Sequence, residues 1–282
     1  MHNLNKIVVT GANRGIGYSI CEGVIKSNNY SSLILTSRDE TLGIEAYNEL
    51  ISKYPNSKEK IYYFNLDVEN ITSIFEFSNY ILKYHGGIDV LVNNIGYLER
   101  TNSNNHEDIN YVISRTIKTF SVNLFSLIFL NNQLLKLNLV NKKIISVSSG
   151  LGKLTFFSKE NNNKLKNASK LSDINYLYFE YLSSIKQKNE WKYFKSNEFN
   201  SYGPSKMFLN LYNEIMGNTF KNLQFTCFCP GICKTRLGEK QAVKSAEEGS
   251  IEGVRLSIDC NINLDLSGKY MENGSIINWK LI

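Results

Sequence analysis

The stretch Ile7-Val8-Val9-Thr10-Gly11-Ala12-Asn13-Arg14-Gly15-Ile16-Gly17 decides the fold of this 282-residue chain. An apolar run leads into a glycine-rich turn and then into an amphipathic stretch through Ile20, Val24 and Ile25, which predicts strand, turn and helix. The spacing G-x-x-x-G-x-G differs from the fingerprint G-x-G-x-x-G, but it permits the same close backbone approach. We therefore expect a dinucleotide pyrophosphate at the helix N-terminus. The alternative is an ordinary glycine-rich turn.

The rest of the chain repeats the same alternation of strand and helix. The apolar runs predict strands at 7–10, 33–36, 61–64, 90–92, 143–147, 225–229 and 268–271. Helical spacing predicts further helices at 40–54, 71–84, 109–120, 124–137 and 247–258. This rhythm is typical of βαβ units with right-handed crossovers. The predicted fold class is α/β: a Rossmann-type doubly wound parallel sheet of about seven strands, with helices on both faces, in one domain spanning 1–282.

Residues 151 to about 200 interrupt this rhythm. The segment from Lys159 to Lys170 is rich in Asn and Lys, which predicts a loop. Asp173 is a candidate cap for a helix that continues to Ile185. The segment is too short for a core of its own, so it is interpreted as an insertion and not as a second domain.

Two arginines stand near the predicted cofactor turn. Arg38 follows the second strand, at the position that meets the adenosine ribose in such folds, and Arg14 projects from the glycine turn. Guanidinium groups suit a 2′-phosphate, which favours NADP over NAD. Asp39 would reverse this preference if the register differed by one residue. The alternative is that Arg38 pairs with Asp39 or Glu40 on the surface. Asp67, at the end of the third strand, is a candidate acceptor for the adenine amino group.

A possible catalytic pair occurs in Ser201-Tyr202-Gly203-Pro204-Ser205-Lys206, where Asn200 or Ser201 is expected to cap a helix. Tyr202 and Lys206 are four residues apart, which places them on one face of that helix. A neighbouring ammonium favours the phenolate, so the pair is suited to general acid–base catalysis near neutral pH. In a chain rich in Tyr and Lys, the pair alone is weak evidence, and it is better explained as one aromatic residue and one lysine on the flank of a helix.

Composition bears on several other classes of function. The net charge is +6 and the positive residues are scattered, which disfavours nucleic-acid binding. The densest basic run, Lys186 to Lys195, is broken by Glu190 and aromatic residues and is interpreted as a solvated helix face. The three histidines are far apart in the sequence, so no metal site is expected.

Cysteine usage and hydropathy bear on location. The five cysteines include no C-x-x-C pair, which is typical of a reducing compartment, and a cytoplasmic protein is expected. No apolar run approaches the roughly 18 residues of a membrane span, so no membrane partner is expected. The first predicted strand begins so early that no room is left for a targeting peptide.

Seven motifs in chain order resemble those of the short-chain dehydrogenase/reductase family, and the resemblance covers nearly the whole chain. They are Thr10-Gly11-x-x-x-Gly15-x-Gly17, Asp67-Val68, Asn93-Asn94-x-Gly96, Asn123, Ser148-Ser149, Tyr202-x-x-x-Lys206 and Pro230-Gly231-x-x-x-Thr235. The chain is most similar to the monomeric NADPH-dependent carbonyl reductases. This subgroup is indicated by Thr36-Ser37-Arg38-Asp39, by the insertion before Tyr202, and by Ser245-Ala246-Glu247-Glu248-Gly249. In that subgroup the insertion covers the surface through which relatives form tetramers, so the resemblance implies a monomer.

The resemblance also implies a role for each matching residue. Tyr202 would donate a proton to a carbonyl oxygen, Lys206 would lower the pKa of that tyrosine and hold the nicotinamide ribose, and Ser149 would hydrogen-bond the carbonyl. Asn123 would support a water that relays protons. The implied NADP(H) contacts are Gly11, Asn13, Arg14, Gly15, Ile16, Gly17, Ser37, Arg38, Asp67, Val68, Asn94, Ile95, Gly96, Tyr202, Lys206, Pro230, Gly231, Ile232 and Thr235.

Two positions depart from the family pattern. Ile95 stands where the family usually has Ala, which would narrow the cofactor site or shift the cofactor. Ile232 stands where the carbonyl reductases usually have Trp, which would remove an aromatic wall from the substrate side. Both isoleucines are also explained by ordinary apolar packing.

The expected function is NADPH-dependent reduction of a ketone, aldehyde or quinone. One alternative is an NADP-dependent dehydrogenase that oxidises an alcohol such as a retinoid or steroid. Another is a non-catalytic NADP-binding regulator. The complete set of Asn123, Ser149, Tyr202 and Lys206 argues against the regulator, because a decayed site would be expected to lose a member.

Overall fold

A computed structural model describes residues 4–99, 108–156, 159–187, 201–238 and 242–281. The strands are β1 (Lys6–Val9), β2 (Ser32–Ser37), β3 (Ile61–Asn65), β4 (Ile88–Asn93), β5 (Val140–Val147), β6 (Gln224–Cys229), β7 (Lys269–Glu272) and β8 (Ser275–Ile277). The α-helices are α1 (Gly15–Ser27), α2 (Glu40–Lys53), α3 (Ile71–Tyr80), α4 (Ile109–Phe120), α5 (Ser126–Lys136), α6 (Lys159–Asn167), α7 (Leu171–Lys186), α8 (Tyr202–Thr219) and α9 (Ala246–Ile258).

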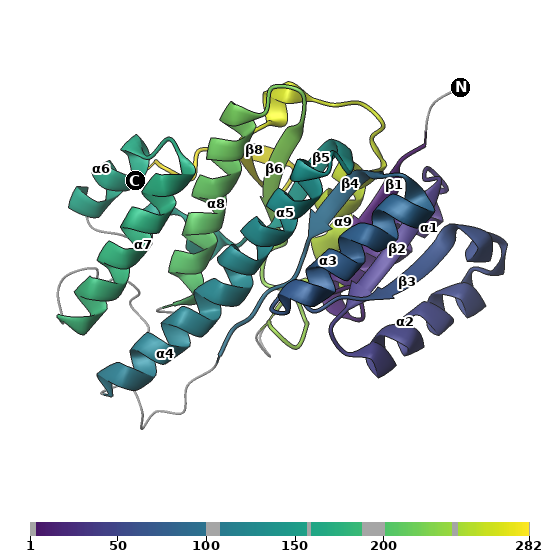
Figure 1. The fold of residues 1–282 in the computed structure, drawn as a ribbon, viewed down its shortest axis with the longest axis horizontal. Coiled ribbons are helices and arrows are strands. Elements are labelled where there is room, and N and C mark those ends of the chain that lie inside the picture. Colours follow the sequence, from purple (N-terminus) through teal and green to yellow (C-terminus); the bar gives the residue numbers. More distant parts are fainter. Residues whose placement is uncertain (1–3, 100–107, 157–158, 188–200, 239–241, 282) are drawn as a thin grey trace.

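The strands form one sheet in the order β3-β2-β1-β4-β5-β6-β7-β8 (Figure 1). Every neighbouring pair is parallel except β7 and β8. The strand order reverses between β1 and β4, and the carboxyl ends of strands at such a switch point are where open α/β sheets bind ligands. The predicted doubly wound α/β fold is confirmed.

The antiparallel strand β8 was missing from the sequence-based prediction. It follows a turn in which Asn273 and Gly274 both have positive φ, 50° and 77°. An Asn-Gly pair with this geometry is the strongest short-range signal for a hairpin. The signal was therefore present in the sequence, and only the shortness of the strand hid it.

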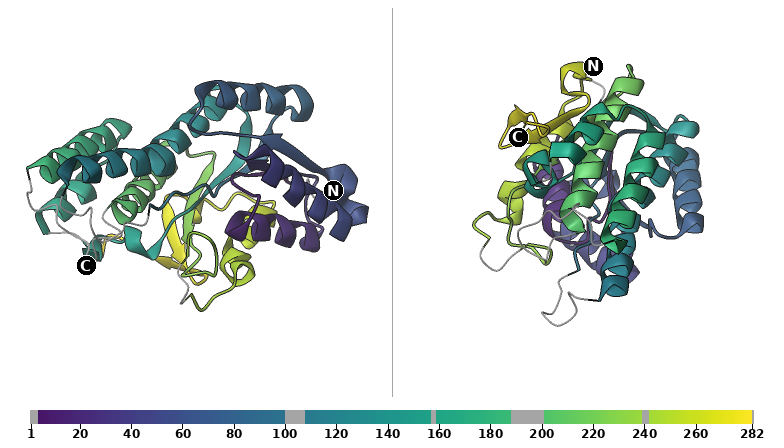
Figure 2. Two further views of the ribbon diagram at one scale, coloured as in Figure 1. Left: turned by 90° about the horizontal axis from the view of Figure 1, so that it is seen from below. Right: turned by 90° about the vertical axis from the view of Figure 1, so that its left-hand side faces the viewer.

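Helices cover both faces of the sheet, which the left view of Figure 2 shows edge-on. One core cluster joins the sheet to α3, α4, α5, α7 and α8, and the other joins it to α1, α2 and α9. Strands β2 and β6 are buried along their whole length, which explains their nearly unbroken apolar runs. On the second face α1 and α9 approach closely, and glycines permit this approach. A Cβ on Gly23 would lie 2.5 Å from Val254, and one on Gly253 would lie 2.8 Å from Ile20.

The two helices predicted at 109–120 and 124–137 form one continuous helix with a π-turn at Ser121–Phe125 between α4 and α5. By length and composition alone, Ile109–Lys136 is the one segment of the described chain that could cross a membrane. Its apolar side is instead committed to the core, where Phe120, Leu124 and Leu130 are buried against the sheet. The π-turn places Asn123 inside the helix.

The prediction of a loop at 159–170 was wrong. Most of this segment is α6, in which Leu165 is fully buried. The Asn- and Lys-rich composition concealed this single anchoring residue, since tertiary packing overrides local propensity. Asp173 takes part in the cap of α7, but as the third residue of the helix and not as its N-cap, which is Lys170. Its Oδ2 accepts the backbone N–H groups of Ser169 and Lys170 at 2.8 and 3.1 Å.

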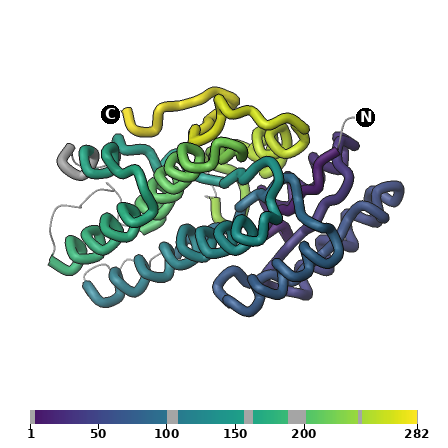
Figure 3. Tube along the Cα trace, turned by 45° about the horizontal axis from the view of Figure 1, so that its top comes forward, coloured from purple at the N-terminus to yellow at the C-terminus, as the bar shows by residue number. Residues whose placement is uncertain are grey.

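Helix α7 runs beside α4 and α8 (Figure 3). Tyr178 packs its ring against Phe120 and Phe125 with centroids 4.8 Å apart in both pairs, and Tyr181 lies 5.6 Å from Phe120. The insertion therefore covers the outer surface of α4 and α8. The predicted basic helix face from Lys186 to Lys195 lies almost entirely outside the described residues.

Candidate active site

Three of the four predicted catalytic residues meet at the carboxyl end of β5. Ser149 follows that strand and opens a 3-10 turn at Gly150–Gly152, while Tyr202 begins α8. The Ser149 side chain lies close enough to the Tyr202 hydroxyl to favour the ionised phenol and lower its pKa. Tyr202 and Lys206 are 8% and 2% exposed, so both polar groups lie in a site largely closed to solvent.

The Lys206 ammonium is held one helical turn from Tyr202. Its Nζ donates a hydrogen bond to the Val147 carbonyl at 2.8 Å and lies 5.7 Å from the centroid of the Tyr202 ring. A Cβ on Gly96 would lie 3.7 Å from this Nζ, so the loop after β4 faces the lysine. Burial lowers the pKa of Lys206 to about 8, because desolvation penalises the charged form.

The expected lowering of the Tyr202 pKa is not found in this structure. Burial raises that pKa above its ordinary value, and the Ser149 side chain offsets this effect only in part. The Lys206 ammonium is engaged by the Val147 carbonyl and does not counter the desolvation. The phenol therefore keeps its proton at neutral pH, which is the form a proton donor needs.

The fourth catalytic candidate, Asn123, lies in the π-turn between α4 and α5, away from the hydroxyl of Tyr202 and the ammonium of Lys206. It is fully buried in the π-turn, and its Nδ2 donates to the Tyr97 carbonyl at 3.0 Å and to Ser205 Oγ at 2.9 Å. Its Oδ1 accepts the Tyr97 N–H at 2.7 Å. The side chain thus clamps the loop after β4 onto the helices and contacts neither Tyr202 nor Lys206 by a hydrogen bond.

Helix α1 begins at the glycine turn without a side-chain cap. Its N-cap is Arg14, which makes no capping hydrogen bond, so the first N–H groups have no side-chain acceptor. Gly15 has φ 58°, which disfavours any other residue. A Cβ on Gly17 would lie 2.4 Å from Asn94 Nδ2 and 2.6 Å from the Gly11 oxygen. This turn fits the pyrophosphate of a dinucleotide.

Asn94 holds that turn in place and is itself partly exposed. Its Nδ2 donates to the carbonyls of Thr10 and Gly11 at 2.9 and 3.0 Å. Its backbone N–H donates to Thr10 Oγ1 at 3.0 Å. Asn13, Ile16 and the other turn residues therefore sit on a backbone fixed from the end of β4.

Arg38 and Asp39, the two candidates for binding the adenosine ribose at the end of β2, have different roles in the structure. Asp39 caps α2, because its Oδ1 accepts the Leu42 N–H at 3.0 Å. Arg38 directly follows the strand and pairs with Glu69 at 3.3 Å. The alternative that Arg38 pairs with Asp39 or Glu40 is therefore wrong about the partner, although the residue does form a surface ion pair.

Ser37 and Asp67, two other predicted contacts of the adenosine, form hydrogen bonds with neighbouring residues of the protein. The Ser37 hydroxyl donates to the Asp39 carbonyl at 2.6 Å and also contacts the Tyr63 hydroxyl. Asp67 Oδ1 accepts the Glu69 N–H at 3.0 Å. Both residues shape the strand ends.

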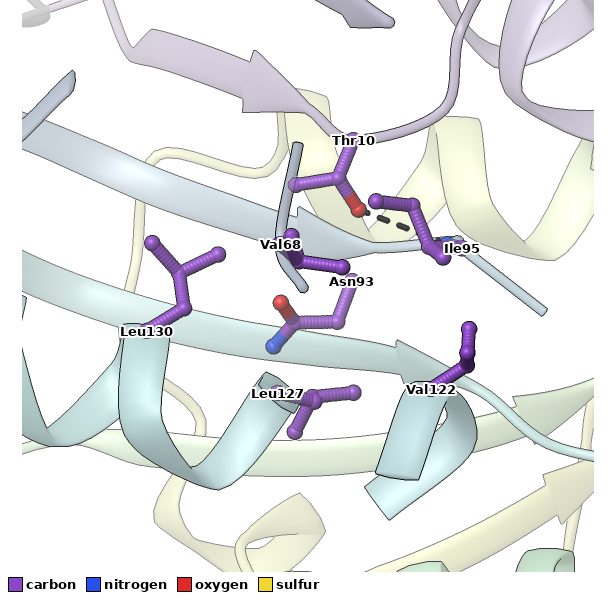
Figure 4. A pocket seen from close by; sticks show the side chains of 7 residues that line it. All are labelled: Thr10, Val68, Asn93, Ile95, Val122, Leu127 and Leu130. Carbon is purple, nitrogen blue, oxygen red and sulfur yellow. Dashed lines mark hydrogen bonds between the residues drawn. The ribbon is translucent and has the colours of Figure 1, made fainter. Parts of the chain in front are cut away.

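A small cavity of about 10 Å³ lies beside the glycine turn (Figure 4). Its lining residues are Thr10, Val68, Asn93, Ile95, Val122, Leu127 and Leu130. Ile95 also presses on the turn, since a Cβ on Gly11 would lie 2.9 Å from its Cγ1. The Ile95 side chain, which replaces the usual Ala of the family, therefore packs against the glycine turn.

The segment after β6 closes the other end of the site. Gly231 has φ 81°, and Ile232 is 64% exposed, so it packs against little of the protein. Thr235 approaches the glycine turn, since a Cβ on Gly15 would lie 3.3 Å from its Cγ2. The segment from Pro230 to Thr235 therefore faces the turn across the site.

Sequence reasoning assigned no role to two residues that organise the site, Thr10, which it quoted only as part of a motif, and Glu69, which it did not single out. Thr10 joins the glycine turn to the loop after β4, as it accepts from Asn94 and donates to the Val92 carbonyl at 3.2 Å. Glu69 pairs with Arg38 and Lys118. Both follow the ends of parallel strands, and that position was the signal that could have found them.

Comparison with known proteins agrees with this geometry. A family model described as short chain dehydrogenase matches residues 5–161. Short-chain dehydrogenase/reductase 1 of Saponaria officinalis is 31% identical over 275 residues, covering 89% of each chain. Carbonyl reductase [NADPH] 3 of Rattus norvegicus is 26% identical, covering 89% of this chain and 90% of the relative. The structure of salutaridine reductase from Papaver somniferum superposes with a TM-score of 0.79 at 26% identity, covering 94% of this chain and 99% of the other.

Proposed function

Because the chain belongs to the short-chain dehydrogenase/reductase family, we propose that it reduces a small-molecule ketone, aldehyde or quinone with NADPH. The observation that carries the proposal is the nearly complete burial of Tyr202 and Lys206, with the Lys206 Nζ 5.7 Å from the centroid of the Tyr202 ring, beside Ser149 at the end of β5. A non-catalytic regulator would have no use for this arrangement. The similarity to a protein named carbonyl reductase [NADPH] 3 supports the same reaction class.

The mechanism follows from the positions of the three polar groups. The glycine turn and the segment from Pro230 to Thr235 would hold the cofactor, whose nicotinamide would supply the hydride. Tyr202 donates its phenolic proton to the carbonyl oxygen as negative charge develops there. Ser149 donates a hydrogen bond to the same oxygen and orients the substrate. Lys206, one helical turn away, would donate a hydrogen bond to the nicotinamide ribose.

Asn123 acts at a distance in this scheme. Its side chain fixes Tyr97 and thereby the loop that carries Gly96 toward Lys206. The π-turn disturbs the regular helical hydrogen bonding at this residue. A water held by the backbone there would return a proton to Tyr202 through Lys206.

The preference for NADPH rests on the charges at the adenosine end. Arg38 directly follows β2, and the competing acid Asp39 is occupied in capping α2. Arg14 adds a second exposed guanidinium at the start of α1. These cations would bind the 2′-phosphate of NADPH, whereas NADH has only an uncharged hydroxyl at this position.

Reduction is favoured over alcohol oxidation by the proposed use of NADP(H), because cellular NADP pools favour reduction. Burial raises the pKa of Tyr202, which agrees with a role as proton donor. We further propose a monomer, because α7 covers the surface of α4 and α8. Sedimentation equilibrium tests this point, and a stable tetramer would contradict it.

The proposal is tested by following NADPH oxidation with a cyclic ketone, an aromatic aldehyde and a quinone. Turnover of at least one carbonyl is expected, with NADPH used far better than NADH. Equal use of the two cofactors would remove the assigned role of Arg38 and Arg14. Absence of turnover with the whole panel, despite tight NADPH binding, would instead support the regulatory alternative.

A further inference from the structure

Glu69 is a carboxylate held between two cations at the adenosine end of the site. Its Oε2 pairs with Arg38 Nη1 at 3.3 Å, and its Oε1 accepts a hydrogen bond from Lys118 Nζ at 2.6 Å. Arg38 follows β2, Glu69 follows β3, and Lys118 lies on α4. One acidic side chain thus connects three elements that border the proposed NADPH site.

The backbones at Arg38 and Glu69 are fixed, whereas two of the cluster's side chains, Arg38 and Lys118, are open to solvent. Asn65 Nδ2 donates to the Arg38 carbonyl at 3.0 Å, and Asp67 accepts the Glu69 N–H at 3.0 Å. The Arg38 side chain is 69% exposed and the Glu69 side chain 21%. An ion pair this exposed contributes little stability, so Arg38 can exchange its partner at small cost.

The charge of Glu69 opposes that of the expected ligand. A 2′-phosphate beside Arg38 must displace the carboxylate from the guanidinium or tolerate its repulsion. NADH carries a hydroxyl at the same place and meets no such opposition. Removal of the carboxylate would also free Lys118 from its present partner.

We propose that Glu69 is a specificity-determining residue, because its carboxylate competes with the 2′-phosphate of NADPH for Arg38 and so limits the preference for NADPH over NADH. This inference rests on the proposed function. It means that Glu69, a residue outside the family motifs of the sequence, lowers the preference of the enzyme for NADPH over NADH.

The direct test is titration calorimetry of the full chain with adenosine 2′,5′-bisphosphate and with AMP, for the wild type and Glu69→Gln. The bisphosphate is expected to bind the variant about three- to tenfold more tightly, because one repulsive charge is gone and one or two cations are released. The affinity for AMP is expected to stay within about twofold. The gain should shrink as salt rises, since the effect is electrostatic.

Two further variants separate competition from other effects. In an Arg38→Gln background the gain from Glu69→Gln should be clearly smaller than in the wild type, because the contested cation is absent and only the loss of repulsion and the release of Lys118 remain. Glu252→Gln removes a carboxylate from another exposed ion pair, with Arg255 on α9, and should leave both affinities unchanged. Thermal unfolding of each variant confirms that it is folded.

The outcomes distinguish this inference from the proposed function. If the wild type binds NADPH and the bisphosphate but Glu69→Gln binds the bisphosphate equally or more weakly, Glu69 does not compete and the inference is wrong. A weaker bisphosphate complex would mean that Glu69 positions Arg38. If the wild type binds neither ligand, the proposed function is wrong and the inference falls with it.

Discussion

The Lys206 ammonium donates a hydrogen bond to the Val147 carbonyl, 2.8 Å away, at the carboxyl end of β5. This bond ties the catalytic helix α8 to the strand that delivers Ser149. It also leaves a positive charge almost fully buried, with its pKa lowered to about 8. The site is thus organised at the expense of stability, as is common where function needs a desolvated charge.

Lys206→Met should stabilise the protein in a pH-dependent manner. In the folded state the lysine loses its proton near pH 8, whereas in the unfolded chain it keeps it to about pH 10.4. The unfolded state therefore binds more protons between these values, so wild-type stability rises with pH across that window. Below pH 8 the methionine variant should be more stable by up to about 3 kcal/mol, and the difference should close toward pH 10.

Urea unfolding of both proteins at several pH values measures this difference. Burial also lowers the pKa of Lys143, but that residue is unchanged in the variant and its contribution cancels. The variant should lose catalytic activity while it gains stability. A stability difference independent of pH would show that Lys206 is not desolvated as the structure indicates.

Asn123→Ala should destabilise the protein and loosen the loop after β4. The substitution leaves the Tyr97 N–H and carbonyl without their side-chain partner, and each unsatisfied buried group costs about 1–3 kcal/mol. Hydrogen exchange at the Tyr97 amide should accelerate accordingly. Asn131→Ala is the matched control, because Asn131 is also a buried helical asparagine, bonded to Asn93 and Tyr212. It should lower stability without a comparable effect on Tyr97.

Gly17→Ala should abolish NADPH binding far more than it affects the overall fold. The new Cβ would lie 2.4 Å from Asn94 Nδ2 and 2.6 Å from the Gly11 oxygen, so the turn itself must move. Gly86→Ala is the control: its φ is 64°, but no atom lies within 4 Å of the added Cβ. That variant should lose about 1 kcal/mol of stability and bind NADPH normally. Normal NADPH binding by Gly17→Ala would contradict the assigned pyrophosphate site.

Much of the fold could be predicted because its signals are local. The buried parallel strands appear as apolar runs, and the glycine turn and the Tyr202–Lys206 spacing are visible in a few residues. The strand order also predicts which edge of the sheet holds the site, namely the carboxyl ends of the parallel strands. Strand β8 was missed because it has only three residues, although the Asn273-Gly274 turn before it is a strong hairpin signal. Helix α6 was missed because its polar composition hides the buried Leu165.

The remaining features depend on side chains brought together from distant elements. No sequence pattern shows that Asn123 bonds the Tyr97 backbone, or that Glu69 reaches both Arg38 and Lys118. The pKa of Tyr202 was predicted in the wrong direction for a similar reason. Spacing places an ammonium near the phenol, but only the three-dimensional structure shows how strongly burial opposes its effect.

The central claim is that Tyr202 delivers the proton, and Tyr202→Phe tests it most directly. Tyr212→Phe removes the same atom from another buried tyrosine of α8, where the hydroxyl accepts from Asn131 at 3.2 Å, and serves as the control. With a carbonyl that the wild type reduces, NADPH oxidation should fall about 10²–10⁴-fold in Tyr202→Phe, while Tyr212→Phe stays active. NADPH oxidation by Tyr202→Phe at the wild-type rate would contradict the mechanism.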